Sequence, residues 1–595
     1  MTNSDSITAE KTILGHPVGL FVLFFTEMWE RFSYYGMRGL LILYIAESAS
    51  ADDPGLGWTN KDAIWLYGWY TMLVYLMAIP GGIVADKWLG QKKTVLIGGL
   101  LLCAGHGVLA IPTSWAFFLG LALIILGVGG LKPNISTMVG GLYKPGDIRR
   151  DKGFTIFYIG INLGAFLAGI TVGIAAKMWG WHVGFGLAGI GMLLGQIVYM
   201  AGQKHLRHVG NFIGKSTDQT VLEAAKKPLT KIEKDRIVVL LLSFLIIIVF
   251  WAAFEQAGGL MNLYTDEKVN RNLGDWWEIP AAVFQSLNAG YIIIFGAIVA
   301  AFWAHRKLKG KESSSLFKMA IGTIIMGLGF IFMMFASREA SSENFGKASM
   351  VWIFLAYLFH TIGELSTSPV SLSFITKLAP LKYASIMMGI YFAATGLGNK
   401  LAGTIGSTSQ LEVYEGKLTS SKDTINAITG KQEIETSKNK TELVYPINWD
   451  KNIELQSEVY LSGNTIVFKK YQGDRVISDL FELDSKNEKR LKEELSEYQA
   501  SQEKPLHAKL LLEKDEEAVK VKENRGDGKD YSVSFVISET QNAQELKIFT
   551  WITIFTVAFG ILLIIFLKKL KKLTHGAEEN ERDIHENEGF ELAEN

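Results

Sequence analysis

A few charged side chains lie inside long apolar stretches of this sequence, and they are the residues best placed to do chemistry. The segment 27–36, EMWERFSYYG, holds Glu27, Glu30 and Arg31. On a helix these positions share one face, because residues three and four apart are neighbours. A charge in hydrocarbon costs at least about 2.5 kcal/mol, so it persists where it is paired, faces water or has a function. Two carboxylates beside one arginine leave a surplus acid that can take up and release a proton.

Three other apolar stretches carry one such charge each, namely Lys132 in GVGGLKPNIS, Glu255 in FWAAFEQAGG and Glu364 in HTIGELSTSP. A lysine at mid-membrane needs a carboxylate or an anionic ligand. The positive charges, Arg31 and Lys132, lie in the first half of the chain, whereas both of these acids lie in the second. If the four charges face one cavity, that cavity suits a zwitterion such as a peptide, which has a carboxylate at one end and an ammonium at the other.

The elements that must position these residues are membrane-spanning helices. Apolar runs of roughly 20 residues recur along the chain, which is the length needed to cross a hydrocarbon core. These runs predict an all-α integral membrane protein with twelve transmembrane helices. The helices are expected at 17–46, 61–85, 92–111, 115–141, 153–176, 181–202, 236–263, 280–305, 315–336, 348–377, 383–407 and 546–570.

Charge in the connections predicts the orientation in the membrane. Lys and Arg collect in the even-numbered connections, as at Lys87, Lys92 and Lys93, whereas Asp52 and Asp53 lie in an odd-numbered one. Positive residues remain on the cytoplasmic side, so both termini are expected there. The membrane is expected to be the plasma membrane, or the inner membrane of a Gram-negative bacterium. The expected parts are a six-helix bundle at 1–202, a cytoplasmic linker at 203–235, helices 7–11 at 236–408, helix 12 at 546–573 and an acidic cytoplasmic tail at 574–595.

Residues 409–545 break the pattern of apolar runs. This stretch is polar, rich in Lys and Glu, and has no run long enough to span a membrane. Alternating segments such as NTIVFKKYQ and DYSVSFVIS are separated by turn residues, which is typical of strands. We expect a small β-rich soluble insert between helices 11 and 12, and its place after helix 11 puts it outside the cytoplasm. The sequence gives no indication of a partner for it.

Composition excludes several other classes of protein. The single cysteine, Cys103, allows neither a disulfide framework nor a Cys-rich metal site. The 59 basic and 59 acidic residues cancel, which gives no sign of a nucleic-acid partner. Because no nucleophile–base pair or metal-ligand spacing stands out, we expect neither an enzyme nor a bound cofactor. The buried carboxylates indicate a proton gradient as the energy source.

At these same residues the sequence resembles the proton-dependent oligopeptide transporter family of the major facilitator superfamily. The family's E-x-x-E-R-F-x-Y-Y pattern is complete from Glu27 to Tyr35. GGIVADKWLGQKKT is similar to the superfamily's helix 2–3 signature, with Gly82, Asp86 and Gly90 in place. GVGGLKPNIS, GFTIFYIGINLGAF, IPAAVFQSLN and GELSTSP are similar to family segments in helices 4, 5, 8 and 10. The resemblance covers all the expected helices but not the insert.

The resemblance implies how protons and peptides would be handled. Glu27, Glu30, Arg31, Lys132 and Glu364 would couple the proton, with Glu30 as the leading carrier. Arg31 and Lys132 would meet the peptide carboxylate and Glu364 the peptide ammonium, and Lys132 would pair with Glu364 when the site is empty. The residues lining the peptide site would be Arg31, Tyr34, Tyr35, Tyr75, Lys132, Asn162, Asn288, Glu364 and Ser368.

The resemblance also implies the moving parts. Arg38 and Glu255 would form an outer gate, and Gly82, Asp86 and Gly90 would serve a conformational switch on the cytoplasmic side. The helices would form two six-helix bundles related by pseudo-two-fold symmetry around a central cavity.

The sequence departs from the family pattern in several places. Gly68 stands where animal members carry a histidine in helix 2, so a proton role there must fall to carboxylates. The short connection at 203–235 has no room for the two extra helices of many bacterial members. Tyr391 stands where members often have Trp in helix 11, which affects side-chain preference.

The resulting functional expectation is a proton-coupled symporter that imports di- and tripeptides by alternating access. Its partners would be peptides, protons and membrane lipid. One alternative is a related symporter for another small anion such as nitrate, which needs only the basic pole. A second is a membrane-anchored receptor or adhesion protein acting through 409–545.

Overall fold

The computed structural model describes residues 12–49, 53–143, 147, 149–211, 228–341, 347–380, 384–411, 414–420, 453–470, 476–477, 482–501, 505–514 and 529–576. Parts of the expected linker and insert, and most of the expected tail, therefore lie outside the described residues. The chain divides into two units. One comprises residues 1–46, 58–407 and 548–595, and the other comprises residues 47–57 and 408–547.

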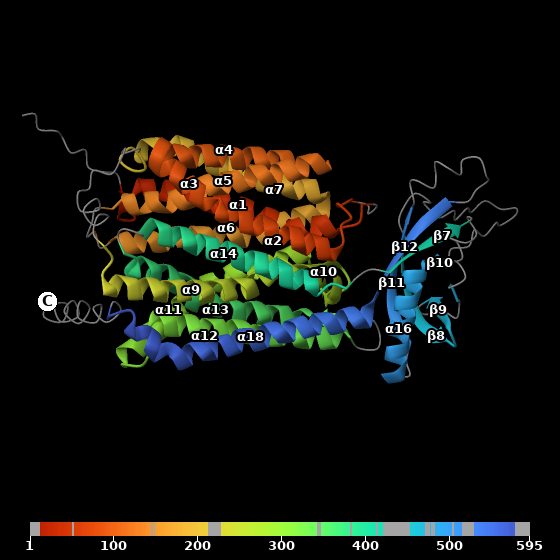
Figure 1. The fold of residues 1–595 in the computed structure, drawn as a ribbon. Coiled ribbons are helices and arrows are strands. Elements are labelled where there is room, and N and C mark those ends of the chain that lie inside the picture. The colour runs from red at the N-terminus through yellow and green to blue at the C-terminus, as the bar shows by residue number, and fades with distance from the viewer. Residues whose placement is uncertain are drawn as a thin grey trace, which may run out of the picture. The chain divides into compact units, whose positions relative to one another are not determined.

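The first unit is a bundle of long helices that run side by side (Figure 1). Its first half contains α1 (Val18–Ala46), α2 (Asn60–Leu76), α3 (Ala78–Val84), a π-helical turn (Ala85–Leu89), α4 (Gln91–Leu109), α5 (Ser114–Gly141), α6 (Arg149–Trp179), α7 (Trp181–Ala201) and a 3-10 turn (Gly202–His205). The single helix expected at 61–85 is thus divided after Leu76. Pro80 has no N–H to donate to the Leu76 carbonyl, which accounts for the break at this point.

The second half contains α9 (Lys231–Phe254), a 3-10 turn (Glu255–Ala257), α10 (Leu260–Lys268), a 3-10 turn (Ala281–Gln285), α11 (Ser286–Leu308), α12 (Ser315–Ala340), α13 (Met350–Leu378), α14 (Ala384–Thr408) and α18 (Ser538–Lys572). α9 begins earlier than expected because Thr230 and Glu233 form a capping box. Its α-helical geometry ends at Phe254, and the 3-10 turn that follows leads to the pair Gly258–Gly259.

Short strand pairs occupy several connections of this unit. β1 (Thr12–Ile13) pairs with β2 (His16–Pro17), β3 (Val269–Asn270) with β6 (Ala348–Ser349), and β4 (Asn272–Leu273) with β5 (Trp277–Glu278).

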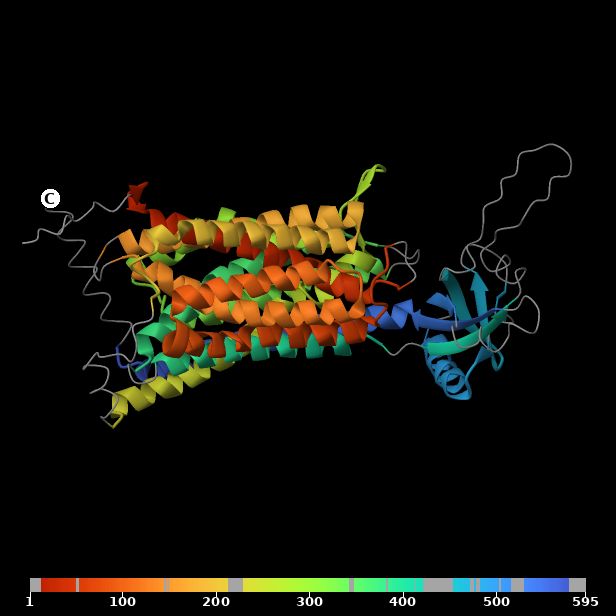
Figure 2. The same ribbon diagram turned by 90° about the horizontal axis from the view of Figure 1, so that it is seen from above.

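Ten helical segments of the described residues are long and apolar enough to cross a membrane. They are 60–89, 91–109, 114–141, 152–179, 181–205, 231–268, 281–308, 315–340, 350–375 and 541–572. α1 and α14 are not among them, yet both lie within the same bundle (Figures 1 and 2). α1 carries Glu27, Glu30, Arg31 and Arg38, and these charges make it less apolar than the ten segments although it lies in the same bundle.

Glycine allows α1 to lie close to α6 at the height of its charged residues. A Cβ atom at Gly164 would lie only 2.1 Å from the Met28 carbonyl oxygen. The missing side chain therefore lets the two backbones touch, as small residues do at helix interfaces in membranes. This contact fixes the turn of α1 that carries Glu27, Glu30 and Arg31.

The second unit contains a six-stranded antiparallel sheet with the strand order β10-β7-β12-β11-β8-β9. The strands are β7 (Tyr414–Ser420), β8 (Ile453–Ser462), β9 (Thr465–Lys470), β10 (Glu482–Leu483), β11 (Leu506–Lys514) and β12 (Lys529–Ile537), and the helix is α16 (Ser485–Ser501). Leu491 and Leu495 of the helix share one buried core with strand residues such as Leu510 and Phe535. In β9, buried Ile466 and Phe468 alternate with more exposed residues, which is typical of a sheet with one covered face.

The two ends of this second unit are joined through one side chain. The Gln541 Oε1 atom accepts a hydrogen bond from the Leu411 amide at 3.0 Å, and Gln541 Nε2 donates to the Ser409 carbonyl at 3.1 Å. The chain therefore leaves and re-enters this unit at neighbouring points.

Candidate functional site

Three buried charges of α1 form one cluster. Arg31 Nε lies 2.8 Å from Glu27 Oε1 and 2.7 Å from Glu30 Oε2, and the three side chains are at most 5% exposed. The spacing of four residues brings Glu27 and Arg31 together on one helix face, as expected from the sequence. The second Glu27 oxygen, Glu30 Oε1 and Arg31 Nη2 have no hydrogen-bond partner. One guanidinium thus faces two carboxylates, and the negative charge is in excess.

Lys132 and Glu364 have separate partners in this structure. Lys132 Nζ lies 3.7 Å from the centre of the Tyr75 ring, and Glu364 Oε2 accepts a hydrogen bond from Asn288 Nδ2 at 2.7 Å. Asn288 Nδ2 also donates to Thr361 Oγ1 at 3.1 Å. The expected ion pair between Lys132 and Glu364 is not among those that the described residues form. Each charge has found a neutral partner instead, a ring face for the cation and an amide for the acid.

A second buried ion pair joins the two halves of the bundle. Arg38 Nη2, on α1, lies 2.6 Å from Glu255 Oε1, at the end of α9. Tyr67 of α2 completes a triangle, because its hydroxyl accepts from Arg38 Nε at 2.6 Å and donates to Glu255 Oε1 at 2.7 Å. Gly258 makes room for it, since a Cβ atom there would lie 1.9 Å from the Tyr67 hydroxyl.

Sequence reasoning identified Arg38 and Glu255 but missed Tyr67. Tyr67 lies in the run YGWYTMLVYL, where several tyrosines alternate with apolar residues and nothing distinguishes this one. The bond that it makes to Glu255 joins residues 188 positions apart. A hydrogen-bonding partner such as Tyr67 could be predicted only after Arg38 and Glu255 are known to pair, because a buried charge pair needs further hydrogen bonds.

Of the remaining expected site residues, Tyr34 and Tyr35 lie on α1, Asn162 on α6 and Ser368 on α13. The Tyr34 and Tyr35 rings pack edge to face with centres 5.4 Å apart, and the Arg31 and Arg38 guanidinium carbons lie 5.8 and 5.7 Å from their respective ring centres. Asn162 is buried, but its amide donates to the Tyr158 carbonyl of its own helix at 2.9 Å. Ser368 lies one turn beyond Glu364 on α13, and its carbonyl accepts from Ser371 Oγ at 2.9 Å.

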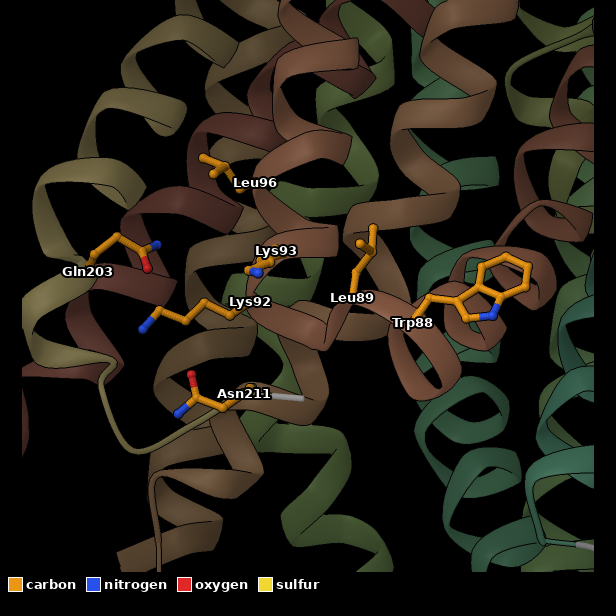
Figure 3. Close-up of a pocket in the computed structure, with 8 residues that line it drawn as sticks. Trp88, Leu89, Lys92, Lys93, Leu96, Gln203 and Asn211 are labelled. Carbon is orange, nitrogen blue, oxygen red and sulfur yellow. The ribbon is translucent and has the colours of Figure 1, made fainter. Parts of the chain in front are cut away.

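The expected switch residues surround the π-helical turn before α4. Asp86 is exposed in this turn, and Gly90 ends it with a φ of 76°, a conformation that favours glycine. Figure 3 shows a cavity of about 490 Å³ beside this turn, which is lined by Lys92 at the start of α4 and by Gln203 and Asn211 after α7. The Lys92 amide donates to the Gly210 carbonyl at 2.8 Å, so residues after α7 are held against the start of α4.

Gly68 lies where two helices meet. A Cβ atom there would lie 2.8 Å from the Gly403 Cα atom of α14. A larger side chain at this position would separate α2 from α14, which gives a packing reason for the glycine.

Together these groups can bind both ends of a zwitterion and hold a proton. Within the described ranges, Arg31 Nη2 has no hydrogen-bond partner and Lys132 forms no ion pair, so both offer donors. Glu364 offers the carboxylate oxygen that Asn288 does not hold. Among the described residues, no cluster of three or more His, Cys, Asp or Glu side chains is placed to hold a metal ion.

Comparisons with known proteins identify the family. The model of the POT family matches residues 92–228 and 214–416. A peptide transporter of Yersinia enterocolitica is 35% identical over 466 residues, which cover 68% of this chain and 90% of the relative. A di-/tripeptide transporter of Lactococcus lactis subsp. cremoris is 35% identical over 441 residues, covering 65% of this chain and 88% of the relative.

Solved structures agree with the sequence relatives. The crystal structure of a variant of the peptide transporter POT in complex with alafosfalin is 35% identical, with a TM-score of 0.61, and covers 67% of this chain and 90% of that one. A POT family transporter in complex with a thioalcohol-conjugated peptide is 31% identical, with a TM-score of 0.60, over 67% of this chain and 91% of that one. Motifs, fold and comparisons lead to one conclusion, that this chain belongs to the POT family, the proton-dependent oligopeptide transporters.

Proposed function

We propose that this chain is a proton-coupled symporter that imports di- and tripeptides by alternating access. The observation that carries the proposal is the imbalance of buried charge. Glu27 and Glu30 share one guanidinium, whereas Lys132 lies against the face of the Tyr75 ring and forms no salt bridge among the described residues. Buried charges left in this state are costly unless a mobile ion or ligand completes them. Relatives whose names describe peptide and di-/tripeptide transporters support the choice of ligand.

The proposed peptide site uses both charge poles. Arg31 and Lys132 would bind the peptide carboxylate, and Glu364 would bind its ammonium. Asn288 holds one oxygen of Glu364 at 2.7 Å and so would orient the acid toward the amine. Tyr34, Tyr35, Tyr75, Asn162 and Ser368 would line the remaining space. Peptide length would be limited by the span between the two poles.

The proposed proton step begins at Glu30. A proton entering from outside would neutralise this carboxylate and weaken its hold on Arg31. The freed guanidinium could then take the peptide carboxylate, so that proton and peptide enter together. Release on the other side would return the proton and restore the pair, which balances one proton taken up by one proton given out. Glu27 would keep Arg31 in place throughout.

The proposed gate is the triangle of Arg38, Tyr67 and Glu255. The Lys177–Glu278 pair at 3.3 Å and the bond from Asn262 Nδ2 to the Gly39 carbonyl at 3.0 Å also join the two halves. These contacts support a state in which the half-to-half contact is closed near residues 265–280. Opening at that end would break them, and Gly82, Asp86 and Gly90 would act at the opposite end.

We propose twelve spanning helices, by adding α1 and α14 to the ten apolar segments. The basic connections then face the cytoplasm together with both termini. The unit formed by residues 408–547 would lie outside the cytoplasm.

The experiment that tests this function is uptake of radiolabelled dialanine by liposomes that contain the purified protein. An imposed inward proton gradient should drive concentrative uptake, and a protonophore should abolish it. If a folded protein gives no gradient-driven uptake of any di- or tripeptide, the peptide assignment is wrong.

The nitrate alternative differs in its need for Glu364. Under the peptide proposal, Glu364→Gln should weaken competition by dialanine far more than competition by its N-acetylated form, because only the former has an ammonium. An unchanged preference for the free amine would count against the peptide site.

The receptor alternative is tested by removing the second unit. Because Gln541 bonds to residues 409–411, the chain can be closed by joining Leu411 to Gln541 through a short Gly–Ser linker. We expect uptake to persist in this deletion variant, whereas a receptor acting through 409–545 would lose its activity.

A further inference from the structure

The two halves of the bundle meet along a seam between α2 and α14. Close contact at this seam depends on small residues. A Cβ atom at Gly68 would lie 2.8 Å from Gly403 Cα, and one at Gly396 would lie 3.0 Å from the Met72 carbonyl. Gly403 also lies against Ile64, whose carbonyl would be 3.0 Å from its Cβ. The seam is therefore packed backbone to backbone over several turns.

One cation lies beside this seam without an acid. Lys400 Nζ, on α14, is 4.6 Å from the centre of the Trp69 ring and 4.8 Å from that of Trp65, both on α2. This nitrogen atom is shielded from solvent and has no hydrogen-bond partner in the part of the chain that the structure describes. Within the described residues it also forms no ion pair with an acid. Trp65 is 49% exposed and Trp69 is 37% exposed, so their outer surfaces face away from the bundle.

Two indole faces stabilise an ammonium that has lost its water. Trp is the strongest aromatic partner for a cation, and the attraction grows when the cation is desolvated. Here the cation comes from the second half of the bundle and both rings come from the first. The stabilisation therefore exists only while α2 and α14 are together.

We propose that Lys400, held between Trp65 and Trp69, is a positioning residue that keeps the α2–α14 seam closed and must leave this aromatic clamp each time the Arg38–Glu255 end opens. The proposal rests on the proposed transport function only in treating that opening as a step of the transport cycle. The clamp itself is a property of the closed bundle. It adds to the Arg38–Tyr67–Glu255 triangle a second lock, at the outer surface of the seam rather than inside it.

The test measures how often the seam opens. Ile64 is fully buried at the seam, so the thiol of Ile64→Cys, in a Cys103→Ser background, reacts with a hydrophilic maleimide only when α2 and α14 separate. In lipid nanodiscs without substrate, Lys400→Met should raise the alkylation rate about tenfold, which corresponds to about 1.4 kcal/mol. Because no peptide is present, this result is independent of whether peptides are the substrate.

Matched variants separate the clamp from general loosening. Lys569→Met is the control, because its ammonium lies 5.5 Å from the ring of Phe566 on its own helix, α18, which is not part of the α2–α14 seam. Lys400→Arg should keep the slow rate, since a guanidinium also binds an indole face. Trp69→Leu should also raise the alkylation rate. The double variant Trp69→Leu/Lys400→Met should react little faster than Lys400→Met alone, because the two substitutions remove the same interaction.

Two results would overturn the proposal. One is an alkylation rate for Lys400→Met equal to that of Lys569→Met. The other is a Lys400→Arg variant as fast as Lys400→Met, which would mean that the packing of the lysine side chain, and not its charge, closes the seam.

Discussion

At the scale of single residues, the buried charges differ in how completely their partners balance them. Arg38 and Glu255 form a one-to-one pair that Tyr67 completes. Arg31 instead faces two carboxylates. A balanced pair suits a gate that holds one conformation, and an unbalanced cluster suits a group that exchanges a proton.

Tyr67 should stabilise the closed gate. Tyr67→Phe removes its donated bond to Glu255, and a hydrogen bond to a charged group contributes about 1.5–3 kcal/mol. We expect the closed conformation to lose about tenfold or more in population relative to the open one. Spin labels at Lys61→Cys and Leu273→Cys, in a Cys103→Ser background, would report a longer and broader distance distribution.

Tyr70→Phe is the matched control for this measurement. Tyr70 is equally buried and lies three residues later on the same helix, but its hydroxyl has no hydrogen-bond partner. Its removal should leave the distances unchanged. Equal effects of the two variants would show that the Tyr67 hydroxyl does not hold the gate.

Contacts within one helix could be predicted from the sequence, and contacts between helices could not. The pairing of Glu27 with Arg31 follows from a spacing of four residues. The Arg38–Glu255 pair joins positions 217 apart, and only the family resemblance pointed to it. The expected contact of Lys132 with Glu364 depends on the conformation of two separate bundles, which no local pattern encodes.

At the scale of elements, apolar length located the helices well but not their internal breaks. The expected helix 61–85 is divided into α2, α3 and a π-helical turn, because apolar content continues through the break. Pro133 and Pro369 lie inside α5 and α13 without ending them. Prolines are tolerated there because neighbouring groups satisfy the freed backbone. Local sequence does not include those neighbours.

Two adjacent glycines of α3 should respond differently to alanine. A Cβ atom at Gly81 would lie 1.8 Å from the Gly129 carbonyl of α5, whereas one at Gly82 would meet nothing within 4 Å. Gly81→Ala should therefore lower the free energy of unfolding by about 1–3 kcal/mol, because the added methyl group overpacks the contact. The melting temperature and the yield of folded protein should fall accordingly.

Gly82→Ala should fold normally and still slow transport. A methyl group at Gly82 would meet no atom in this conformation. If Gly82 acts in the switch, the methyl group must meet a neighbour in the alternative conformation of the transport cycle. The measurements are the melting temperature and the turnover of both variants in liposomes. Normal turnover of Gly82→Ala would remove Gly82 from the proposed switch.

The end of α18 is tied to the connection between α11 and α12 by Glu312. Its carboxylate accepts from the Ser314 amide at 2.9 Å and from Lys571 Nζ at 3.0 Å. Partial burial alone would raise the pKa of Glu312, but the bonds from Ser314 and Lys571 outweigh it and lower the pKa from 4.5 to about 2. A lowered pKa stabilises the fold above pH 4.5, and this contribution is lost as the pH falls toward 2.

Glu312→Gln should therefore lower the melting temperature equally at pH 8 and pH 5.5. The effect should be small, about 1 kcal/mol or less, because the Glu312 side chain is 35% exposed and water screens the pair. The deficit should shrink below about pH 4.5, where the wild-type carboxylate begins to lose its charge. A deficit that grows as the solution becomes acidic would contradict this assignment.

At the scale of the whole molecule, two unlike units share one chain. The insert was expected at 409–545 from its polar, alternating sequence, and the second unit comprises 408–547 together with residues 47–57. Nothing in the composition of 47–57 indicated that it would group with a segment 360 residues away. Long-range grouping of this kind depends on where chain ends emerge from the bundle, which a linear pattern does not contain.

The central claim for the whole molecule is that Glu30 carries the coupled proton. It is tested most directly by comparing dialanine uptake in liposomes for wild type, Glu30→Gln and Glu312→Gln, both under an inward proton gradient and in gradient-free exchange. Glu312 is the control acid, because it is not part of the proposed gate. Burial raises its pKa, but the bonds from Ser314 and Lys571 outweigh burial and lower the pKa to about 2, so Glu312 stays charged near neutral pH.

The account predicts that Glu30→Gln loses gradient-driven uptake but still exchanges labelled for unlabelled dialanine, while Glu312→Gln keeps both activities. Concentrative, gradient-driven uptake by Glu30→Gln would contradict it.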